Sequence, residues 1–439
     1  MVLPEHILYC IRTLEDAGFA TYAVGGCVRD WLLGLCPHDY DLCTAATPDA
    51  VQSLFSHRAL VLSGLKHGTV GVVFDHEVVE ITTFRTEGGY ADGRHPDWVR
   101  FVTDVTEDLA RRDFTVNAMA WSPTAGLADP FGGVDDLKNK VLRAVGNPEK
   151  RFREDPLRIL RGVRFAVRFG LEPETHTFEA MNALSPLMDV LARERVFDEL
   201  CKLLPLATAS DLIRYAAILT QPIPELATAI GFDQRSPHHA YDLFTHIAHV
   251  VEGVPPTLPL RWAALLHDVG KVPSFTTDEN GRGHFYGHAP MGAKIADEIL
   301  HRLKAPTDLR EQVVALVELH MTRLEPDRKL LRRRLSRYGK DTVEQMLLLQ
   351  EADMGSKGTG HEEELAVFPE IRQLLADIYE ENACLTVKDL AVNGQDLIAL
   401  GYKPGKALGQ CLQGLLEQVV DETVPNEREA LLETARSRL

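Results

Sequence analysis

The sequence predicts an α+β protein in which a small mixed sheet near the N-terminus is followed by a helical remainder. Between residues 21 and 120, short β-branched runs such as TVGVVF (69–74) alternate with helical segments, one of which opens with Thr47 as N-cap and Pro48 in its first turn. From about Glu154 onward, Leu, Ala, Arg and Glu recur at helical spacing and alternating runs are almost absent. A chain of 439 residues has room for about three domains of roughly 150 residues each.

Composition and charge exclude several classes of protein. Hydrophobic residues make up 45% of the chain and charged residues 25%, so a disordered or fibrous protein is excluded. Lys and Arg number 47 against 64 Asp and Glu, and with a net charge of −17 any nucleic acid must be bound by local basic patches. The seven cysteines form no CxxC pair, and neither a signal peptide nor an apolar run of about 18 residues is present, so we expect a cytoplasmic protein with free thiols and no membrane contact.

A predicted strand that runs into two glycines is the first candidate for a binding site. The segment 21–34 reads TYAVGGCVRDWLLG. Gly25 and Gly26 would let backbone N–H groups approach an anion, and the N-terminus of the following helix favours negative charge. A triphosphate could bind there beside Arg29, although a plain turn between a strand and a helix has the same pattern.

Two carboxylates follow this turn in the segment HDYDLC (38–43). Asp39 and Asp41 are two residues apart in an extended stretch, which places both on one face. Two like charges side by side are costly unless a cation neutralises them, and paired oxygen ligands suit Mg²⁺. Glu80 is either a third carboxylate facing the same ions or a solvated residue at a strand edge.

Together with three later segments, these motifs resemble the polymerase-β-like nucleotidyltransferases, and among them the bacterial class II tRNA nucleotidyltransferases and the related poly(A) polymerases. The later segments are RRDFTVNAMA (111–120), DPFGGVDDL (129–137) and REDPLRILRGVRFAVRFG (153–170). The resemblance implies an N-terminal nucleotidyltransferase head in which Asp39 and Asp41 are catalytic ligands of two Mg²⁺ ions.

The resemblance also implies roles for the neighbouring polar residues. Gly26 and Arg29 would contact the triphosphate, and Arg112, Asp113 and Asn117 would assist at phosphate and ribose. In two-metal transfer, one ion activates an RNA 3′-hydroxyl for attack on the α-phosphate, and the other neutralises the pyrophosphate leaving group. No side-chain nucleophile is required.

Arginines dominate the segment 151–170. Arg158, Arg161, Arg164 and Arg168 recur at helical spacing and should share one face of a helix, with Asp155 three residues before the first of them. This stripe could be a solvated surface, but six arginines against two acidic residues is a strong excess in an acidic protein and favours a binding role.

The resemblance makes Asp155 and Arg158 a protein template that imitates a base pair. Cytosine and adenine each offer an amino donor beside a ring-nitrogen acceptor, which a carboxylate and a guanidinium can pair with. Guanine and uracil present the reverse order and would leave buried polar groups unpaired, at a cost of about 1–3 kcal/mol per group. Arg161 and Arg164 would hold phosphate or base at the rim.

The segment between Arg85 and Glu107 is rich in Gly and Asp, and it predicts a mobile loop beside the site. Family members that add only C are shortened here, so an intact loop favours addition of A. A plain surface excursion is the alternative.

A second constellation lies in the helical part, where the apolar run of RWAALLHDVGK (261–271) ends at His267 and Asp268. A single His on an apolar helix is usually a core residue. Here further candidate ligands flank the pair: His246, His284, His288, His320 and Asp353. Imidazoles that share carboxylates bind transition metals and can bridge two ions.

The order H, HD, H, H, D over residues 246–353 resembles the HD phosphohydrolase superfamily. It implies that His246, His267, Asp268 and Asp353 hold a metal such as Ni²⁺, Mn²⁺ or Co²⁺, and that His288 and His320 support a second ion. Either this site hydrolyses phosphate esters, or the domain only spaces an RNA-binding surface.

The C-terminal segment 389–419 resembles the helical end of HD-containing CCA-adding enzymes. Its GYKPG turn (401–405) is either a phosphate contact through Lys403 and Lys406 or a loop that joins two helices. The basic cluster at 327–340 either touches RNA or is a solvated helix face.

We expect four parts: a nucleotidyltransferase head (1–145), a helical neck with the template and RNA-binding helices (146–230), an HD domain (231–360) and a helical tRNA-binding tail (361–439). The predicted activity is template-independent addition of CCA to the 3′ end of tRNA from CTP and ATP. Addition of the final A alone is an open alternative. A poly(A) polymerase would benefit from a strongly basic tail, which is absent, and a uridylylating regulator would need a template for U and a ligand-binding domain after residue 360.

Overall fold

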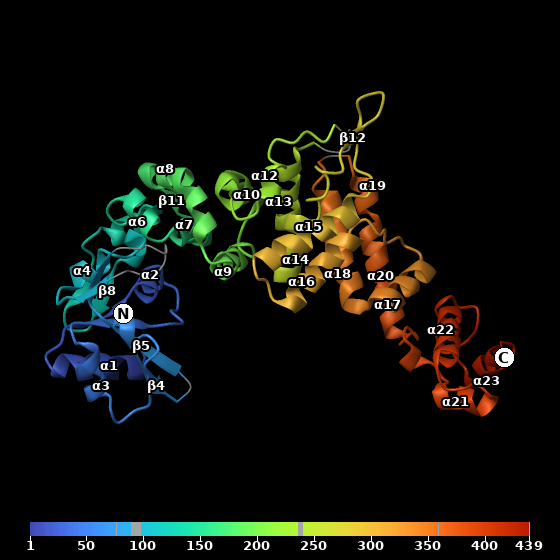
Figure 1. Ribbon diagram of the computed structural model, residues 1–439, viewed down its shortest axis with the longest axis horizontal. Helices are drawn as coiled ribbons and strands as arrows, with labels where there is room; N and C mark the ends of the chain where they lie inside the picture. Colours follow the sequence, from blue (N-terminus) through green and yellow to red (C-terminus); the bar gives the residue numbers. More distant parts are fainter. Residues whose placement is uncertain (76, 89–97, 236–239, 359, 439) are drawn as a thin grey trace. The chain divides into compact units, whose positions relative to one another are not determined.

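The structure is a computed structural model that describes residues 1–75, 77–88, 98–235, 240–358 and 360–438 (Figure 1). The chain forms two compact units, one of residues 1–207 and 214–227 and the other of residues 208–213 and 228–439. Within the described ranges, no helix combines the length and the apolar character needed to cross a bilayer.

The first unit is built on a seven-stranded mixed sheet with the strand order β3-β4-β5-β2-β1-β8-β9. Its strands are β1 (Thr21–Val24), β2 (Asp41–Thr44), β3 (Leu60–Val61), β4 (Thr69–Phe74), β5 (Glu77–Thr83), β8 (Ala120–Ser122) and β9 (Gly126–Ala128). Strands β2 and β5 are parallel neighbours, and the other adjacent pairs are antiparallel. The prediction of a small mixed sheet is confirmed.

The two faces of this sheet have different partners. Helix α1 (Glu5–Asp16) contacts β1, and α3 (Pro48–Leu54), capped by the Thr47 side chain as predicted, contacts β4 and β5. On the other face, Cys43 of β2 packs in a cluster with Leu109, the last residue of α4 (Val105–Leu109). Because side chains alternate along a strand, Asp41 lies on the same face as Cys43.

The helical neck of this unit departs from the sequence prediction at one point. Helix α6 (Pro148–Glu154) ends before Asp155, and α7 (Leu157–Phe169) starts after Pro156. Asp155 has an extended backbone, with φ −144° and ψ 99°, because a proline disfavours the helical region for the residue before it. Asp155 therefore precedes the arginine-bearing helix and does not lie on its face.

The predicted loop after Arg85 is structured at its base. Strands β6 (Arg85–Gly88) and β7 (Trp98–Phe101) pair in antiparallel fashion, which corrects the expectation of a loop throughout. Residues 89–97, at the centre of that loop, lie outside the described residues.

The first unit contains further short elements: α2 (Gly26–Leu32), η1 (Leu65–His67), η2 (Thr115–Asn117), α5 (Gly133–Lys138), β10 (Val141–Leu142), β11 (Glu172–Pro173), α8 (Thr175–Leu184), η3 (Ser185–Val190), α9 (Arg193–Leu203), α11 (Ala216–Leu219) and α12 (Pro224–Ala227).

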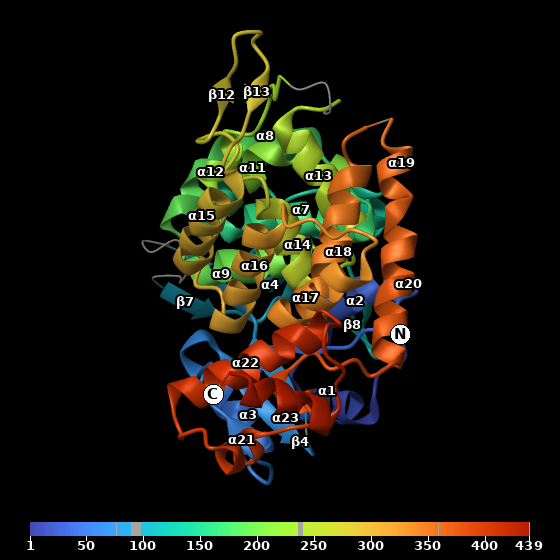
Figure 2. The same ribbon diagram turned by 90° about the vertical axis from the view of Figure 1, so that its right-hand side faces the viewer.

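The second unit is helical apart from a short hairpin (Figure 2). Its elements are α10 (Ala209–Arg214), α13 (Leu243–Gly253), α14 (Leu258–Leu266), β12 (Thr276–Thr277), β13 (Gly283–His284), α15 (His288–Arg302), α16 (Thr307–Leu319), α17 (Arg328–Tyr338), α18 (Lys340–Gly355), α19 (Glu362–Leu365), α20 (Val367–Glu380) and η4 (Val387–Asp389). Helices α14 and α16 each contact α18, and α13 packs against both α14 and α18.

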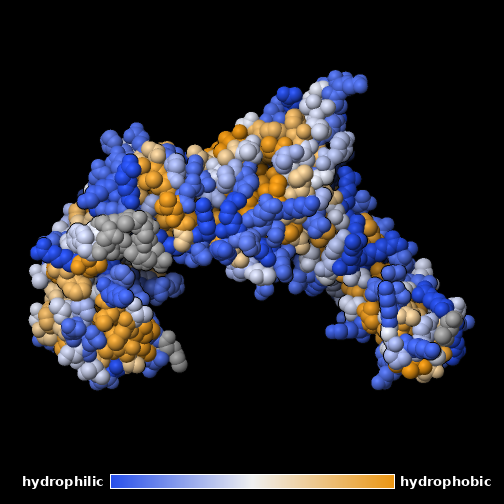
Figure 3. Space-filling view, in the orientation of Figure 1, coloured by the Kyte–Doolittle hydropathy of each residue, from blue (hydrophilic) through white to orange (hydrophobic). Residues whose placement is uncertain are grey.

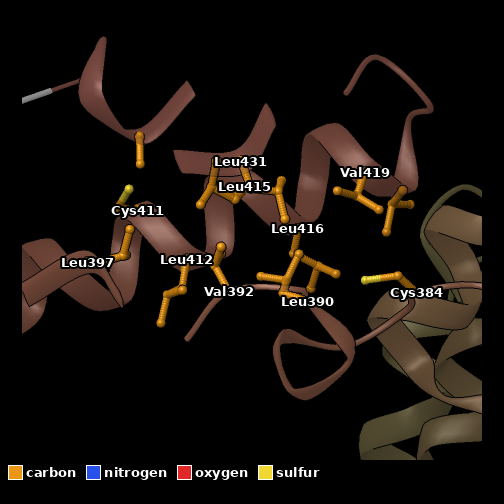
Figure 4. Close-up of a cluster of buried hydrophobic side chains, with 12 residues drawn as sticks. Cys384, Leu390, Val392, Leu397, Cys411, Leu412, Leu415, Leu416, Val419 and Leu431 are labelled. Carbon is orange, nitrogen blue, oxygen red and sulfur yellow. The ribbon is translucent and has the colours of Figure 1, made fainter. Parts of the chain in front are cut away.

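The last three helices of this unit have an apolar core of their own (Figure 4). They are α21 (Gly394–Leu400), α22 (Lys406–Val420) and α23 (Arg428–Arg436). Leu397, Leu415 and Leu431 are fully buried at its centre. The predicted GYKPG turn joins α21 to α22, and Gly401 ends α21 with a φ of 113°, a conformation that glycine adopts without strain.

The basic cluster of residues 327–340 forms α17 and pairs with acidic residues near α22. Arg332 is buried, and it donates to Oε1 of Glu422 at 2.6 Å and to the Val419 carbonyl at 3.0 Å. Two more arginines form pairs there: Arg328 with Glu381 and Glu422, and Arg333 with Asp421. These arginines therefore join helices, a use that the sequence does not predict.

Hydrophilic side chains are spread over the visible face of both units between smaller hydrophobic patches (Figure 3).

Replacing Arg332 with Gln should lower the free energy of unfolding by about 1–3 kcal/mol, because the buried guanidinium's bonds to Glu422 and to the Val419 carbonyl are lost. The neighbouring Arg333→Gln is the matched control, since Arg333 is exposed and its loss should change stability little. Chemical denaturation of both variants measures the difference. Equal losses would contradict a special role for the buried arginine.

Candidate functional site

The glycine turn after β1 is shaped by its first residue. Gly25 has a φ of 79°, and a Cβ added there would lie 2.9 Å from Nη1 of Arg112. Its N–H donates to the Met119 carbonyl at 3.0 Å, so Gly25 contributes a backbone shape rather than a free donor. Gly26 then begins α2. The turn therefore brings Arg112 close to the backbone where an anion was predicted.

Asp41 lies directly beside this turn, because it pairs with Val24 across β1 and β2. Partial removal from water raises the pKa of Asp41, the neighbouring Asp39 raises it further, and Arg112 lowers it. A divalent cation bound by both carboxylates would offset the cost of charging Asp41 there. The predicted role of this pair as metal ligands stays a prediction.

The position of Glu80 relative to Asp41 follows from the register of β2 and β5. Leu42 of β2 pairs with Ile81 of β5, and one residue further back the same register puts Glu80 beside Asp41 on one face of the sheet. Glu80 lines a cavity of about 520 Å³ that also has Arg85 and Arg195 in its wall. Glu80 is exposed there, so its role as a third carboxylate stays a prediction.

Arg29 is engaged within the protein. Its guanidinium is buried and donates to Oδ1 of Asp30 at 2.6 and 2.9 Å and to Oδ1 of Asn117 at 2.5 Å. It also lies over the Phe169 ring, 4.3 Å from the centroid. Burial lowers the pKa of Arg29, and Asp30 opposes this effect. Contact of Arg29 with a triphosphate stays a prediction.

Asp113 is the centre of a buried polar network between η2 and α7. Its Oδ1 accepts from Nδ2 of Asn117 at 3.1 Å and from the Phe114 N–H at 2.8 Å. Its Oδ2 accepts from Nε and Nη2 of Arg161 at 2.9 and 2.7 Å. Burial alone would raise the pKa of Asp113, but Arg161 and Arg158 lower it to about 2.

The predicted arginine face points into this network. Arg161 lies 4.0 Å from Glu199 of α9, and Arg164 donates to the same carboxylate at 2.6 Å. Arg158 is buried and donates to the Arg111 carbonyl at 3.0 Å. A solvated stripe is therefore excluded for Arg158 and Arg164.

Asp155 is held by a residue that the sequence analysis missed. Arg195 of α9 donates to Oδ2 of Asp155 at 2.8 Å and to Oδ1 at 3.3 Å.

Asp108 was also missed: it is fully buried and accepts from Arg111 and Arg112. The spacing of Asp108 to these arginines, three and four residues, is a signal that could have been read. Arg195 gave no such signal, because its partner is 40 residues away.

The second unit assembles the predicted histidine cluster, and each ring is oriented by a carbonyl. Nδ1 of every ring lies 2.7–3.2 Å from a backbone oxygen: His246 with Ser356, His267 with Ala264, His288 with Phe285 and His320 with Val317. A carbonyl oxygen only accepts, so Nδ1 carries the hydrogen and each neutral ring has its lone pair on Nε2.

These Nε2 atoms converge on Asp268. They lie at 3.2 Å for His267, 3.6 Å for His246, 3.5 Å for His288 and 3.8 Å for His320 from its carboxylate oxygens. Oδ1 of Asp353 lies 3.1 Å from Nε2 of His246. Two groups have the spacing of a metal site: His246, His267 and Asp268, and Asp268, His288 and His320.

One contact within this cluster points to a cation. Nε2 of His288 and Nε2 of His320 are 3.1 Å apart although both rings donate through Nδ1, so two lone pairs face each other. Burial lowers the pKa of His288, and burial followed by the charge of His267 lowers that of His320 to about 4. Protonation is thus a poor remedy, whereas a shared metal ion satisfies both nitrogens.

The cluster opens into a cavity of about 280 Å³. Cationic side chains in its wall include Lys271, whose Nζ lies 2.7 Å from Asp268, and Lys357 beside Asp353. His284 lines the cavity but pairs with Asp278 and stacks on Tyr286, so it lies outside the metal cluster. A cavity with candidate metal ligands at its base and cations in its wall would suit a phosphate group.

Three family descriptions match parts of the chain. Residues 21–143 match the Poly A polymerase head domain, residues 170–229 match the probable RNA and SrmB-binding site of polymerase A, and residues 284–435 match a putative tRNA nucleotidyltransferase domain 2.

Whole proteins of known name are also similar. A CCA-adding enzyme of Streptococcus suis is 34% identical over 430 residues, and one of Ligilactobacillus salivarius is 32% identical over 440 residues; each alignment covers 98% of this chain and 95% of the relative. The crystal structure of the Bacillus stearothermophilus CCA-adding enzyme in complex with CTP has a TM-score of 0.71 at 28% identity and covers 100% of this chain and 98% of its own. The Thermotoga maritima CCA-adding enzyme complexed with tRNA shares the fold, with a TM-score of 0.62 at 22% identity over 99% and 96% of the two chains.

Replacing Asp113 with Ala should lower the free energy of unfolding by about 1–3 kcal/mol, because the buried Asn117 side chain and the Phe114 N–H lose their acceptor. The matched control is Asp135→Ala, which removes an exposed carboxylate from α5. Denaturant titration followed by circular dichroism compares the two. A loss for Asp113→Ala as small as that of the control would contradict the network.

Proposed function

The chain belongs to the family of CCA-adding enzymes, and from this premise we propose which of its residues carry out the reaction. As a tRNA nucleotidyltransferase, it adds CCA to the 3′ end of tRNA from CTP and ATP without a nucleic-acid template. The observation that carries our assignment is the position of Asp41, which pairs with Val24 directly before the glycine turn and is two residues from Asp39.

We assign Asp39 and Asp41 as the ligands of two Mg²⁺ ions. When bound there, the ions activate the attacking 3′-hydroxyl and neutralise charge on the leaving pyrophosphate. Arg112 is well placed for a phosphate oxygen, because it lies beside Gly25 and its buried Nε has no hydrogen-bond partner among the described residues. Glu80, beside Asp41 in the sheet, is our candidate for a third carboxylate.

Base selection is assigned to Asp155 and Arg158. The carboxylate accepts from the amino group of cytosine or adenine, and the guanidinium donates to the adjacent ring nitrogen. The contacts of Asp113 with Asn117 and Arg161 hold α7 of the neck against the head. They thereby help to fix the position of Arg158, which lies on the same helix.

We propose the same division of labour along the chain that the sequence predicts. Residues 1–145 are the head, 146–230 the neck, 231–360 the HD domain and 361–439 a tail that contacts tRNA. A tRNA substrate and seven free cysteines favour the cytoplasm as the location.

The experiment that tests the activity uses three tRNA transcripts, which end before the first C, before the second C and before the final A. Each nucleotide is offered singly. We expect C on the first two transcripts and A on the third. Extension of the third transcript alone would identify an enzyme that adds only A, and repeated A on all three would identify a poly(A) polymerase.

Asp39→Ala and Asp41→Ala should each abolish nucleotide addition and leave the protein folded, because a metal ligand is lost while carboxylate repulsion is relieved. Asp49→Ala, which removes an exposed carboxylate from α3, is the matched control and should stay active. Incorporation of radiolabelled CTP measures the effect. Substantial Mg²⁺-dependent incorporation by either site variant would rule out the assignment.

A second candidate function is favoured by the facing lone pairs of His288 and His320. We propose that the histidine cluster binds transition-metal ions such as Mn²⁺, Ni²⁺ or Co²⁺ and hydrolyses phosphate esters. Imidazole ligands prefer these ions, and the lysines of the cavity wall suit a phosphate. The alternative is a domain that only spaces an RNA-binding surface.

The double variant His267→Ala/Asp268→Ala should lose two properties of the parent: the rise in thermal midpoint when Mn²⁺ or Ni²⁺ is added, and hydrolysis of p-nitrophenyl phosphate or 2′,3′-cyclic nucleotides. CCA addition should stay within a few fold of the parent. His301→Ala, on the exposed side of α15, is the control. A parent that neither binds nor hydrolyses would favour the spacer, and loss of CCA addition by a folded variant would show that the modules are coupled.

A further inference from the structure

Arg195 and Asp155 form an ion pair with a fixed geometry. The guanidinium grips both carboxylate oxygens, with Nη2 at 2.8 Å from Oδ2 and Nη1 at 3.3 Å from Oδ1. The Leu157 N–H also donates to Oδ1 at 3.1 Å. Since a fork of two parallel donors sets both the plane and the rotation of a carboxylate, the side chain of Asp155 is held in one orientation.

The pair lies where a nucleotide can reach it. The side chains of Arg195 and Asp155 are 22% and 17% exposed, so neither is closed off from solvent. Arg195 also lines the cavity of about 520 Å³ that contains Glu80, beside Asp41 in the sheet. Arg195, the cationic half of the ion pair, is therefore part of a wall of that cavity.

The contacts with Arg195 and Leu157 leave the Asp155 carboxylate few free acceptor positions. A carboxylate offers about four acceptor positions, two on each oxygen. The two donors on Oδ1 and the single donor on Oδ2 use three of them, which leaves one position on Oδ2. One remaining acceptor with a fixed direction matches one amino hydrogen of cytosine or adenine.

We propose that Arg195 is a positioning residue for base selection, which holds Asp155 so that a single acceptor is presented to the incoming base. The proposal rests on the template role assigned to Asp155. A carbonyl oxygen of uracil or guanine that meets this acceptor finds no donor, and Asp155 cannot rotate to avoid it. Without Arg195, the Leu157 N–H still contacts Oδ1 but the plane of the carboxylate is no longer fixed, and the penalty for the wrong base falls.

The other nearby arginines do not replace Arg195. Arg161 donates to Asp113, and Arg164 donates to Glu199. Arg158 donates to the Arg111 carbonyl. Lysine is a poor substitute as well, because a point charge does not fix the plane of a carboxylate. The selectivity for C and A should thus depend on the two parallel donors of the Arg195 guanidinium and not only on its positive charge.

The test compares Arg195→Gln and Arg195→Lys with the matched control Arg193→Gln on the same helix, whose guanidinium contacts the Asp189 carbonyl. Values of kcat and KM are measured for CTP, ATP, UTP and GTP on tRNA transcripts. Both Arg195 variants should lose at least about tenfold in the ratio of correct to incorrect nucleotide, and the control should keep the parent ratio. A purely structural role would instead lower the rates for all four nucleotides equally and leave the ratio unchanged.

Combination with Asp155→Ala separates this proposal from the template itself. If Arg195 acts through Asp155, adding Arg195→Gln to Asp155→Ala should cause no further loss of selectivity. Unchanged selectivity in both Arg195 variants, or an additive loss in the combination, overturns the proposal. If Asp155→Ala alone keeps the parent ratio, the template assignment fails, and the role of Arg195 fails with it.

Discussion

The buried carboxylate of Asp113 is the interaction on which the arrangement of the first unit depends. It accepts from Asn117 in η2 and from Arg161 in α7, so it joins the end of the sheet region to the longest helix of the neck. Through Asn117 it reaches Arg29, and through Arg161 it reaches Glu199. A charge in this position is tolerable only because it is completely paired. The pairing holds α7 against η2, and Asp155 directly precedes that helix.

The two candidate metal sites differ in exposure and in the type of ligand atom that they offer. Asp39 and Asp41 are exposed as residues and offer oxygen ligands, which suits an ion that keeps much of its water, such as Mg²⁺. The cluster around Asp268 is buried and offers four imidazole nitrogens already oriented by backbone carbonyls, which suits a transition metal. Because the ligand types differ, the two proposed sites should prefer different ions.

The sequence predicts the parts of this structure that depend on local pattern. The mixed sheet and the cap of α3 lie where periodicity and spacing place them, and the four histidines and two aspartates that the HD resemblance groups together do lie close to one another. What it misses are partners brought in by tertiary contact: Arg195 on Asp155, Glu199 on Arg164 and Glu422 on Arg332. The break at Asp155 could have been predicted, since the residue before a proline avoids the helical region.

Base selection by protein groups is the central claim, and its most direct measurement removes the group that Asp155 is assigned to recognise. A CTP analogue whose ring lacks the amino group is compared with CTP by kcat/KM, in the parent and in Asp155→Ala. The parent should disfavour the analogue by about ten- to a hundredfold, the value of one buried hydrogen bond, and the variant should hardly distinguish the two. Equal discrimination by parent and variant would show that the amino group is recognised elsewhere.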